Sequence, residues 1–196
     1  MIMRAFIICC LLCSASADDL MSRLQQASQQ VHRVRLRFEQ HKDLALFDAP
    51  VITPGVIELD REHGCLRWEF TGRTVLILAH DAVHKWGADG REEIGFERDP
   101  SLQAMRGQMQ ALLTGDWSTV RAVFSIREAG DGLGLILTPS EPALAKYLST
   151  VTIHFRTDLS APESLVLEAA GGDRTDYHFA VPDIDPVLDP ARFTGP

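Results

Sequence analysis

The sequence lacks a concentrated basic charge, and after its first residues it has no long apolar run. Its 196 residues contain 19 Lys and Arg against 27 Asp and Glu, which gives a net charge of −8. Proteins that bind nucleic acid obtain most of their affinity from a basic face, so this acidic balance argues against that class. Beyond the N-terminal segment, no run approaches the roughly 20 apolar residues of a membrane helix. Both absences favour a globular domain.

The sequence also lacks the motifs that commonly mark an enzyme. It contains no Gly-x-Ser-x-Gly elbow, no glycine-rich phosphate loop and no His-Glu-x-x-His pair. His80 and His84 are four residues apart, but strand geometry in their alternating stretch would separate them by roughly 13 Å. No pair of carboxylates sits in an apolar setting that would separate their pKa values for acid–base chemistry. We therefore expect no catalysis, no bound metal and no cofactor.

Residues 1–17 have the layout of a cleavable secretory signal. Arg4 supplies one positive charge, residues 5–13 are apolar, and the small residues 14–17 precede Asp18. The apolar run is too short to span a membrane. We expect this segment to be removed on secretion.

A lipoprotein signal is the alternative reading of this segment, because Cys9, Cys10 and Cys13 lie within it. Such a signal needs a small residue just before the cysteine. The preceding residues here are Ile8, Cys9 and Leu12. This pattern favours a secreted product without a lipid anchor.

The mature chain, residues 18–196, is expected to form one domain. Removal of residues 1–17 from the 196-residue chain leaves 179 residues, and the loss of Arg4 changes the net charge from −8 to −9. No internal repeat or linker divides this length, which suffices for a sizeable core. Cys65 is the one cysteine that remains, so we expect no internal disulfide and a half-buried cysteine in a strand.

The spacing of apolar residues predicts one helix followed by many strands. Asp18 and Asp19 suit the first turn of a helix over residues 18–30. After it, apolar and polar residues alternate, and the breaker Pro54-Gly55 precedes the second strand. The sequence predicts about eleven short strands of an antiparallel sheet that curls on itself. They lie near residues 33–39, 56–59, 66–70, 74–79, 82–86, 91–96, 120–127, 133–138, 151–156, 164–169 and 175–181.

Two further segments, residues 101–115 and 141–148, have helical spacing and can cover one face of this sheet. We interpret the first as a lid whose underside faces a cavity. Methionine suits surfaces that repack around variable ligands. The alternative is that the same stripe is ordinary core, and periodicity alone does not separate the two readings. The apolar stripe consists of Met105, Met109, Leu112 and Leu113.

Several short motifs, in their order and spacing, resemble the LolA family of lipoprotein carriers. Residues 57–69 are similar to a family signature in which an Arg-Pro turn precedes a strand that ends in tryptophan. Residues 22–24 and 38–40 resemble the opening of that family, and residues 189–193 resemble its ending. The resemblance spans residues 20–193.

This resemblance implies a curved, unclosed antiparallel half-barrel whose hydrophobic cavity is covered by a helical lid. It implies a monomeric carrier in the periplasm of a Gram-negative bacterium. Such carriers shield the acyl chains of lipoproteins, which they accept from an inner-membrane ABC transporter and deliver to an outer-membrane receptor. The physical need is clear, because each methylene buried in a bilayer contributes about 0.8 kcal/mol.

The resemblance also assigns residues. Arg61 matches the family arginine at the barrel mouth, which is thought to tether the lid and to govern release, although Glu62 stands in place of the usual proline. Arg67 is the rival, but alternation puts it on the face opposite Leu66 and Trp68. A solvated turn arginine is the third reading of Arg61. The expected cavity and lid residues are Arg61, Leu66, Trp68, Phe70, Met105, Met109, Leu112 and Leu113.

Three other functions remain open at this point. The chain ends soon after Phe193, without the C-terminal extension of typical carriers, which suggests a divergent paralogue that carries another lipid or lipid-linked product. A regulatory module that senses lipoproteins would share the half-barrel, although known modules of this kind have a second domain. A hydrolase with a dispersed site is the third possibility.

Overall fold

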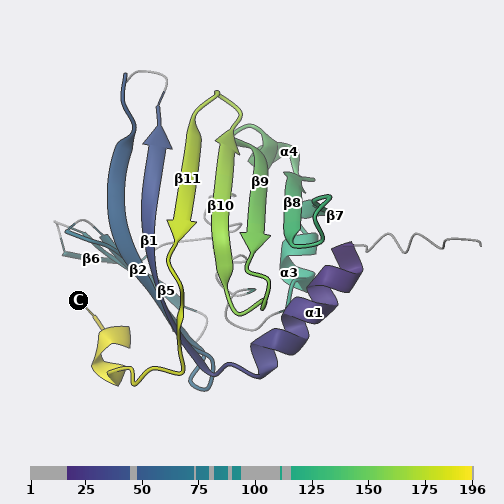
Figure 1. Ribbon diagram of the computed structural model, residues 1–196. Coiled ribbons are helices and arrows are strands. Elements are labelled where there is room, and N and C mark those ends of the chain that lie inside the picture. Colours follow the sequence, from purple (N-terminus) through teal and green to yellow (C-terminus); the bar gives the residue numbers. More distant parts are fainter. Residues whose placement is uncertain are drawn as a thin grey trace, which may run out of the picture.

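One antiparallel sheet runs through most of the described chain (Figure 1). The computed structural model describes residues 17–44, 48–72, 74–79, 82–87, 90–93, 111 and 116–195. The strands are β1 (Arg33–Asp43), β2 (Val51–Asp60), β3 (Cys65–Phe70), β4 (Thr74–Ala79), β5 (Ala82–Gly87), β6 (Gly90–Glu93), β7 (Phe124–Glu128), β8 (Gly134–Pro139), β9 (Leu148–Phe155), β10 (Pro162–Ala169), β11 (Arg174–Phe179) and β12 (Asp183–Ile184).

The strand order is β6-β5-β4-β3-β2-β1-β11-β10-β9-β8-β7, and the short β12 pairs with β1 outside this path. The end strands β6 and β7 do not pair with each other among the described residues, so the sheet is unclosed. Figure 1 shows β5 and β6 lying behind β1 and β2. The predicted mainly-β, antiparallel and unclosed architecture is confirmed.

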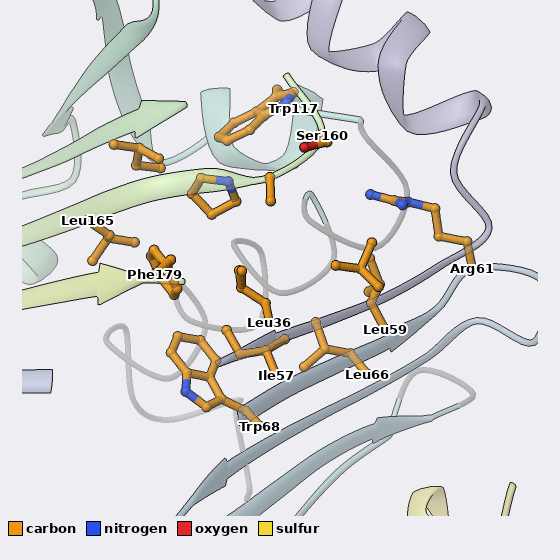
Figure 2. Close-up of a pocket in the computed structure, with 14 residues that line it drawn as sticks. Leu36, Ile57, Leu59, Arg61, Leu66, Trp68, Trp117, Ser160, Leu165 and Phe179 are labelled. Atoms are coloured by element: carbon orange, nitrogen blue, oxygen red, sulfur yellow. The ribbon is translucent and has the colours of Figure 1, made fainter. Parts of the chain in front are cut away.

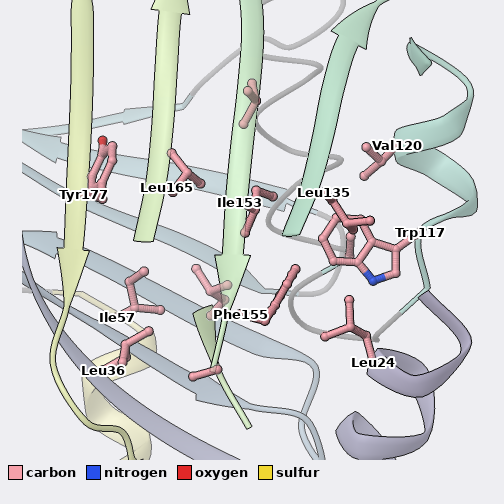
Figure 3. Close-up of a cluster of buried hydrophobic side chains, with 14 of the residues drawn as sticks. Leu24, Leu36, Ile57, Trp117, Val120, Leu135, Ile153, Phe155, Leu165 and Tyr177 are labelled. Carbon is pink, nitrogen blue, oxygen red and sulfur yellow. The ribbon is translucent and has the colours of Figure 1, made fainter. Parts of the chain in front are cut away.

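The sheet therefore has an inner face, which its two halves share, and an outer face. Because successive strand residues point to opposite faces, Leu36, Ile57 and Leu66 lie on the inner face. Their neighbours Glu58 and Arg67 lie on the outer face. The inner side chains join one hydrophobic cluster with residues of β7 to β11 (Figure 3).

Helices make a small part of the described chain. They are α1 (Ala17–Gln29), α3 (Ser118–Arg121), α4 (Pro142–Ala145) and the single 3-10 turn η2 (Pro190–Phe193). The prediction for α1 is right to within one residue at each end, and Leu20, Met21 and Leu24 are buried in the inner cluster. No helix in the described part of the chain has the length and apolar character needed to cross a membrane.

The predicted lid helices are not evident in the described residues. Of residues 101–115, only Ala111 is described, and it is helical and buried. Met105, Met109, Leu112 and Leu113 lie outside the described residues. The predicted helix 141–148 is wrong over its second half, because α4 ends at Ala145 and β9 begins at Leu148. β9 pairs with β10, and its β-branched residues Thr150 and Val151 favour a strand. A helix over residues 141–148 would be too short to be stable alone.

The Pro54-Gly55 pair does not break the chain as predicted, because both residues lie inside β2. The carbonyl of Pro54 accepts a hydrogen bond from the amide of Thr71 at 2.9 Å, just beyond the last β3 pair. The missing amide hydrogen of proline therefore interrupts no ladder bond there. Gly55 pairs with Phe38 and is required at this position, because a Cβ would overlap the Phe38 ring and the Glu69 carbonyl.

Candidate functional site

An apolar pocket lies on the inner face, between β1 to β3 and the strands β9 to β11 (Figure 2). Its cavity volume is about 70 Å³. All but two of the lining side chains are hydrocarbon or aromatic; the exceptions are Arg61 and Ser160. The lining consists of Val34, Leu36, Ile57, Leu59, Arg61, Leu66, Trp68, Trp117, Ile153, Ser160, Ala161, Pro162, Leu165 and Phe179.

Two further hollows adjoin this pocket. One, of about 50 Å³, lies under α1 beside Leu24 and shares Arg61, Trp117 and residues 160–162 with the main pocket. The other is an open groove of about 240 Å³ beside α1 and α3, and it shares only Trp117 with the main pocket. The indole of Trp117 thus borders all three spaces and is packed edge-on against Phe155 at 6.0 Å. No sequence motif pointed to Trp117.

An aromatic cluster forms one wall of the inner face. The Phe38 ring contacts four other aromatic rings at centroid distances of 5.5–6.2 Å. Trp68 stacks on Phe70 at 5.9 Å, and Tyr177 stacks on Phe179 at 6.1 Å. Edge-to-face and offset ring pairs of this kind each add about 0.5–1.5 kcal/mol beyond burial. Two of these rings, Trp68 and Phe179, also line the pocket.

Two polar groups are buried within this aromatic wall. Gln40 donates its side-chain amide to the Tyr177 hydroxyl. Burial of Tyr177 raises the pKa of its hydroxyl to about 12, although the Gln40 hydrogen bond acts in the opposite direction. The indole nitrogen of Trp68 is also buried, and it has no hydrogen-bond acceptor among the described residues.

Arg61 stands at one end of the pocket (Figure 2). Its Nη1 donates to the carbonyl of Val31 at 2.9 Å, and its backbone amide donates to the carbonyl of His32 at 2.9 Å. Both bonds fix the β2–β3 turn to the segment between α1 and β1. Burial lowers the pKa of the Arg61 guanidinium from its ordinary value, and the charge of Asp185 opposes that shift. The structure therefore places a partly desolvated cation beside an apolar space.

The predicted site residues differ in where they lie relative to the pocket. Arg61, Leu66 and Trp68 line the pocket, whereas Phe70 does not line it but packs against Trp68. The four predicted lid residues lie outside the described residues. Sequence reasoning missed the opposite wall, although the strands expected over residues 151–156, 164–169 and 175–181 contain several of its side chains. That wall consists of Trp117, Ile153, residues 160–162, Leu165 and Phe179.

Arg67 lies on the outer face, away from the pocket, and its side chain is 3% exposed. Its Nη1 donates to the carbonyls of Arg192 at 2.7 Å and Gly195 at 2.6 Å. Its Nε and Nη2 donate to Glu69 at 3.0 and 2.9 Å. Of the two candidate arginines, Arg61 is the one that borders the pocket.

A polar cluster at the β2–β3 turn has the residue types of a metal site. Ligand atoms of Asp60, Glu62 and His63 lie within 4.8 Å of one another. Arg33, however, donates to Asp60 at 3.3 Å and also to Glu62. Its guanidinium already supplies the positive charge that would balance these carboxylates. We therefore interpret this group of described residues as an ion-pair cluster.

Comparison with known proteins finds likeness of fold alone. No protein-family model and no curated protein matches the sequence. A DUF1329 family protein from Desulfovibrio piger aligns with a TM-score of 0.52 and 11% identity, over 89% of this chain and 94% of that one. An uncharacterized conserved protein from Thermus thermophilus aligns with a TM-score of 0.51 and 8% identity, over 91% of this chain and 92% of that one.

A LolA superfamily protein from Nitrosomonas europaea aligns with a TM-score of 0.45 and 6% identity, over 89% of this chain and 96% of that one. The likenesses with higher scores, to the two proteins named first, show a shared fold.

Proposed function

We propose that this protein binds acyl chains in the inner-face pocket and carries acylated cargo between the two membranes across the periplasm. The observation that carries the proposal is an unfilled space whose lining is apolar except for Arg61 and Ser160. An interior at ordinary packing density has few voids of this size. An unfilled apolar space is suited to a hydrocarbon guest.

The energetics of acyl transfer support a carrier with such a pocket. A chain of roughly sixteen carbons gains about 13 kcal/mol from burial in a bilayer, at about 0.8 kcal/mol for each methylene. An apolar pocket that buries the same surface offsets most of this cost of extraction. Affinity must also stay modest enough for delivery. We propose that an inner-membrane ABC transporter supplies the cargo, an outer-membrane receptor accepts it, and the carrier acts as a monomer.

The cavity is smaller than pockets that usually hold ligands, so the binding of an acyl chain has to widen it. Pockets that hold ligands commonly measure about 300–1,000 Å³, whereas this cavity measures about 70 Å³. The two walls belong to different halves of the sheet, with Ile57 and Leu66 on one side and Ile153 and Leu165 on the other. We infer that cargo separates these two walls, and that their return to contact assists release.

The polar groups of the pocket do not suggest catalysis. Ser160 is the one hydroxyl residue of the described lining, and its Oγ donates to Asp158 at 2.7 Å. A serine nucleophile needs a base that accepts its proton, commonly histidine, and no histidine lines this pocket among the described residues. The site therefore supports binding in place of turnover.

The proposal is tested by purification of the full chain from the periplasm of a Gram-negative host, followed by native mass spectrometry. We expect acylated species to co-purify, and we expect the emptied protein to take up a fluorescent fatty-acyl probe. A protein that is always empty and binds no probe would overturn the proposal. Transfer of a labelled lipoprotein between inner- and outer-membrane vesicles then tests the carrier role. Uptake without transfer would favour a sensing module of the same fold.

A further inference from the structure

Trp117 lies where the open groove meets the two enclosed hollows of the site. The groove of about 240 Å³ beside α1 and α3 shares Trp117 with the main pocket and with the hollow under α1, and it shares no other described residue with either. The main pocket and the hollow under α1, by contrast, have several lining residues in common. A direct passage from the groove into the enclosed spaces therefore leads past this indole.

The side chain of Trp117 closes this passage by packing. The residue is 7% exposed, and its ring lies edge-on against Phe155 at 6.0 Å. Figure 3 shows the indole beside Leu24 of α1, with which it lines the hollow under that helix. The backbone is held separately, because the carbonyl of Trp117 accepts a hydrogen bond from the amide of Arg121 at 3.0 Å. Rotation of the indole to another rotamer would open the passage and leave this backbone bond in place.

The two sides of Trp117 differ in polarity. The pocket side is almost wholly hydrocarbon and aromatic, whereas most of the groove is polar. The charged groups of the groove have partners, because Arg121 donates to Asp18, and Asp116 accepts from the amide and the hydroxyl of Ser118 at 2.8 and 2.9 Å. Tryptophan suits a boundary that is apolar on one side and wet on the other. The groove is lined by Asp18, Met21, Ser22, Gln25, Asp116, Trp117, Ser118 and Arg121.

We propose that Trp117 is the gate of the acyl pocket: the hydrocarbon tail of the cargo enters from the groove and displaces the indole from Phe155, and the polar end of the cargo stays in the groove. This inference rests on the proposed function and adds an entrance, a site for the polar end and an orientation for the tail. The tail then runs from Trp117 toward Trp68, which Figure 2 shows on the other side of the pocket. The opposite orientation would bury the polar end beside Trp68 among apolar side chains, at a cost in free energy.

The orientation is tested with two bromododecanoates, because bromine quenches tryptophan fluorescence at close range. The chain has three tryptophans. Trp68→Phe with Trp86→Phe leaves Trp117 as the fluorophore, and Trp117→Phe with Trp86→Phe leaves Trp68. Bromine on the carbon next to the carboxylate should quench Trp117 more than Trp68, and bromine on the terminal carbon should quench Trp68 more. Equal quenching of both tryptophans by both probes, or the reverse order, would overturn the proposed orientation.

The gate itself is tested by the rates of uptake and release of a fluorescent fatty-acyl probe. Trp117→Ala should speed both rates at least about tenfold, because a lower barrier acts equally in the two directions. The affinity should change less than either rate. Leu165→Ala is the matched control, since Leu165 lines the pocket but does not border the groove. It should weaken binding through faster release alone, and the same behaviour in Trp117→Ala would show that Trp117 is only a wall of the pocket.

A block in the groove tests the entrance without a change in the interior. Ser22 is exposed on α1 and lines the groove, whereas its exposed neighbour Arg23 lines none of the three hollows. Each is replaced by cysteine and coupled to a bulky maleimide, and wild-type protein treated with the reagent controls for the buried Cys65. The label at position 22 should slow uptake at least about tenfold, and the label at position 23 should leave it unchanged. Equal uptake by the two labelled proteins would show that cargo enters elsewhere.

The outcomes separate this inference from the proposed function. Wild-type protein that takes up no acyl probe contradicts the proposed function itself. Wild-type protein that takes up the probe, together with labelled groove variants that take it up at equal rates, overturns the entrance and leaves acyl binding intact. The labelled proteins keep Trp117, so this result holds even where Trp117→Ala fails to fold. Circular dichroism confirms that each variant is folded.

Discussion

The inner and outer faces of β1 to β3 differ in what they bury. On the inner face, Ile57 and Leu66 join an apolar cluster that leaves a pocket unfilled. On the outer face, Glu58 is 1% and Arg67 3% exposed, although both are charged. The two kinds of side chain alternate along the same strands.

The outer face buries these charges because the C-terminal segment covers it. The turn η2 packs against β3 and β4, and Arg192 donates to Glu58 at 2.5 Å and to Glu69 at 3.1 Å. Glu58 also accepts a hydrogen bond from Arg35 at 2.8 Å. Each buried charge is therefore matched by an opposite charge, as burial of ions requires.

The comparison teaches that burial has two different uses in this sheet. On the outer face, close polar contacts hold residues 190–195 against the sheet. On the inner face, apolar side chains pack into one cluster but leave a space of about 70 Å³ unfilled. We therefore expect substitutions on the outer face to act on stability and substitutions in the pocket to act on binding.

The largest effect is expected for Arg67→Met. The change removes one of the two arginines that donate to Glu69, and it also removes the bonds to the carbonyls of Arg192 and Gly195. Leaving buried polar groups unpaired costs about 1–3 kcal/mol for each group, so we expect the free energy of unfolding to fall by about 3 kcal/mol. Chemical denaturation measures it, with the exposed Arg37→Met as control, expected within about 0.5 kcal/mol of the wild type. Equal stability of both variants would contradict the comparison.

The next effect concerns binding and is expected for Ala161→Phe. Ala161 is buried and borders both the main pocket and the hollow under α1, so a phenyl ring would fill existing space. We expect the affinity for a fatty-acyl probe to fall at least about tenfold, which corresponds to about 1.4 kcal/mol. The free energy of unfolding should change by less than about 1 kcal/mol, because the ring enters a void.

Ala145→Phe is the control for the filled pocket, since Ala145 is exposed on α4. It should leave acyl uptake unchanged. Full uptake by the Ala161→Phe variant would show that the guest lies elsewhere.

A smaller effect, dependent on pH, is expected at Asp60. Burial raises the pKa of this carboxyl, but hydrogen bonds from His63 and Arg33 outweigh it and hold the pKa below its ordinary 3.8. A carboxyl whose pKa is lower in the folded state stabilises the fold above its unfolded pKa, and this stabilisation is lost as pH falls through the folded value. The stability difference between wild type and Asp60→Asn should therefore shrink below about pH 4. Acid titration of both proteins measures it, and a constant difference would refute the assignment.

The smallest effect is expected for Trp68→Phe. The substitution removes packing area but also removes an indole N–H that has no acceptor among the described residues. Leaving a buried donor unpaired costs about 1–3 kcal/mol, so the two contributions oppose each other. We expect a net change in the free energy of unfolding below about 1 kcal/mol. Tyr177→Phe should cost more, because it deprives the buried Gln40 amide of its acceptor.

Much of the sheet was predictable because a strand reveals itself through local alternation. Val34, Leu36 and Phe38 alternate with arginines, and β1 forms where this pattern predicted it. The same rule correctly put Arg67 opposite Leu66. The prediction that Pro54-Gly55 breaks the chain before the second strand was wrong, because whether a proline interrupts a strand depends on where the neighbouring strand ends.

The candidate site was predictable only in part. Alternation and the family resemblance indicated Leu66 and Trp68 on one wall of the pocket. Trp117 and Ala161 on the opposite wall carry no local signal, because they border the pocket through the curl of a sheet that brings distant segments together. The roles proposed for the four lid residues stay predictions.

The sequence by itself determined a mainly β chain, the first helix and the face to which each strand residue points, because helix and strand periods are local properties of the backbone. Only the tertiary structure decided which charges are buried and where the pocket lies. Glu58 and Arg192 meet across 134 positions, and Arg67 meets Gly195 across 128. Such partners depend on strand order and on the path of the C-terminus, which no local pattern encodes.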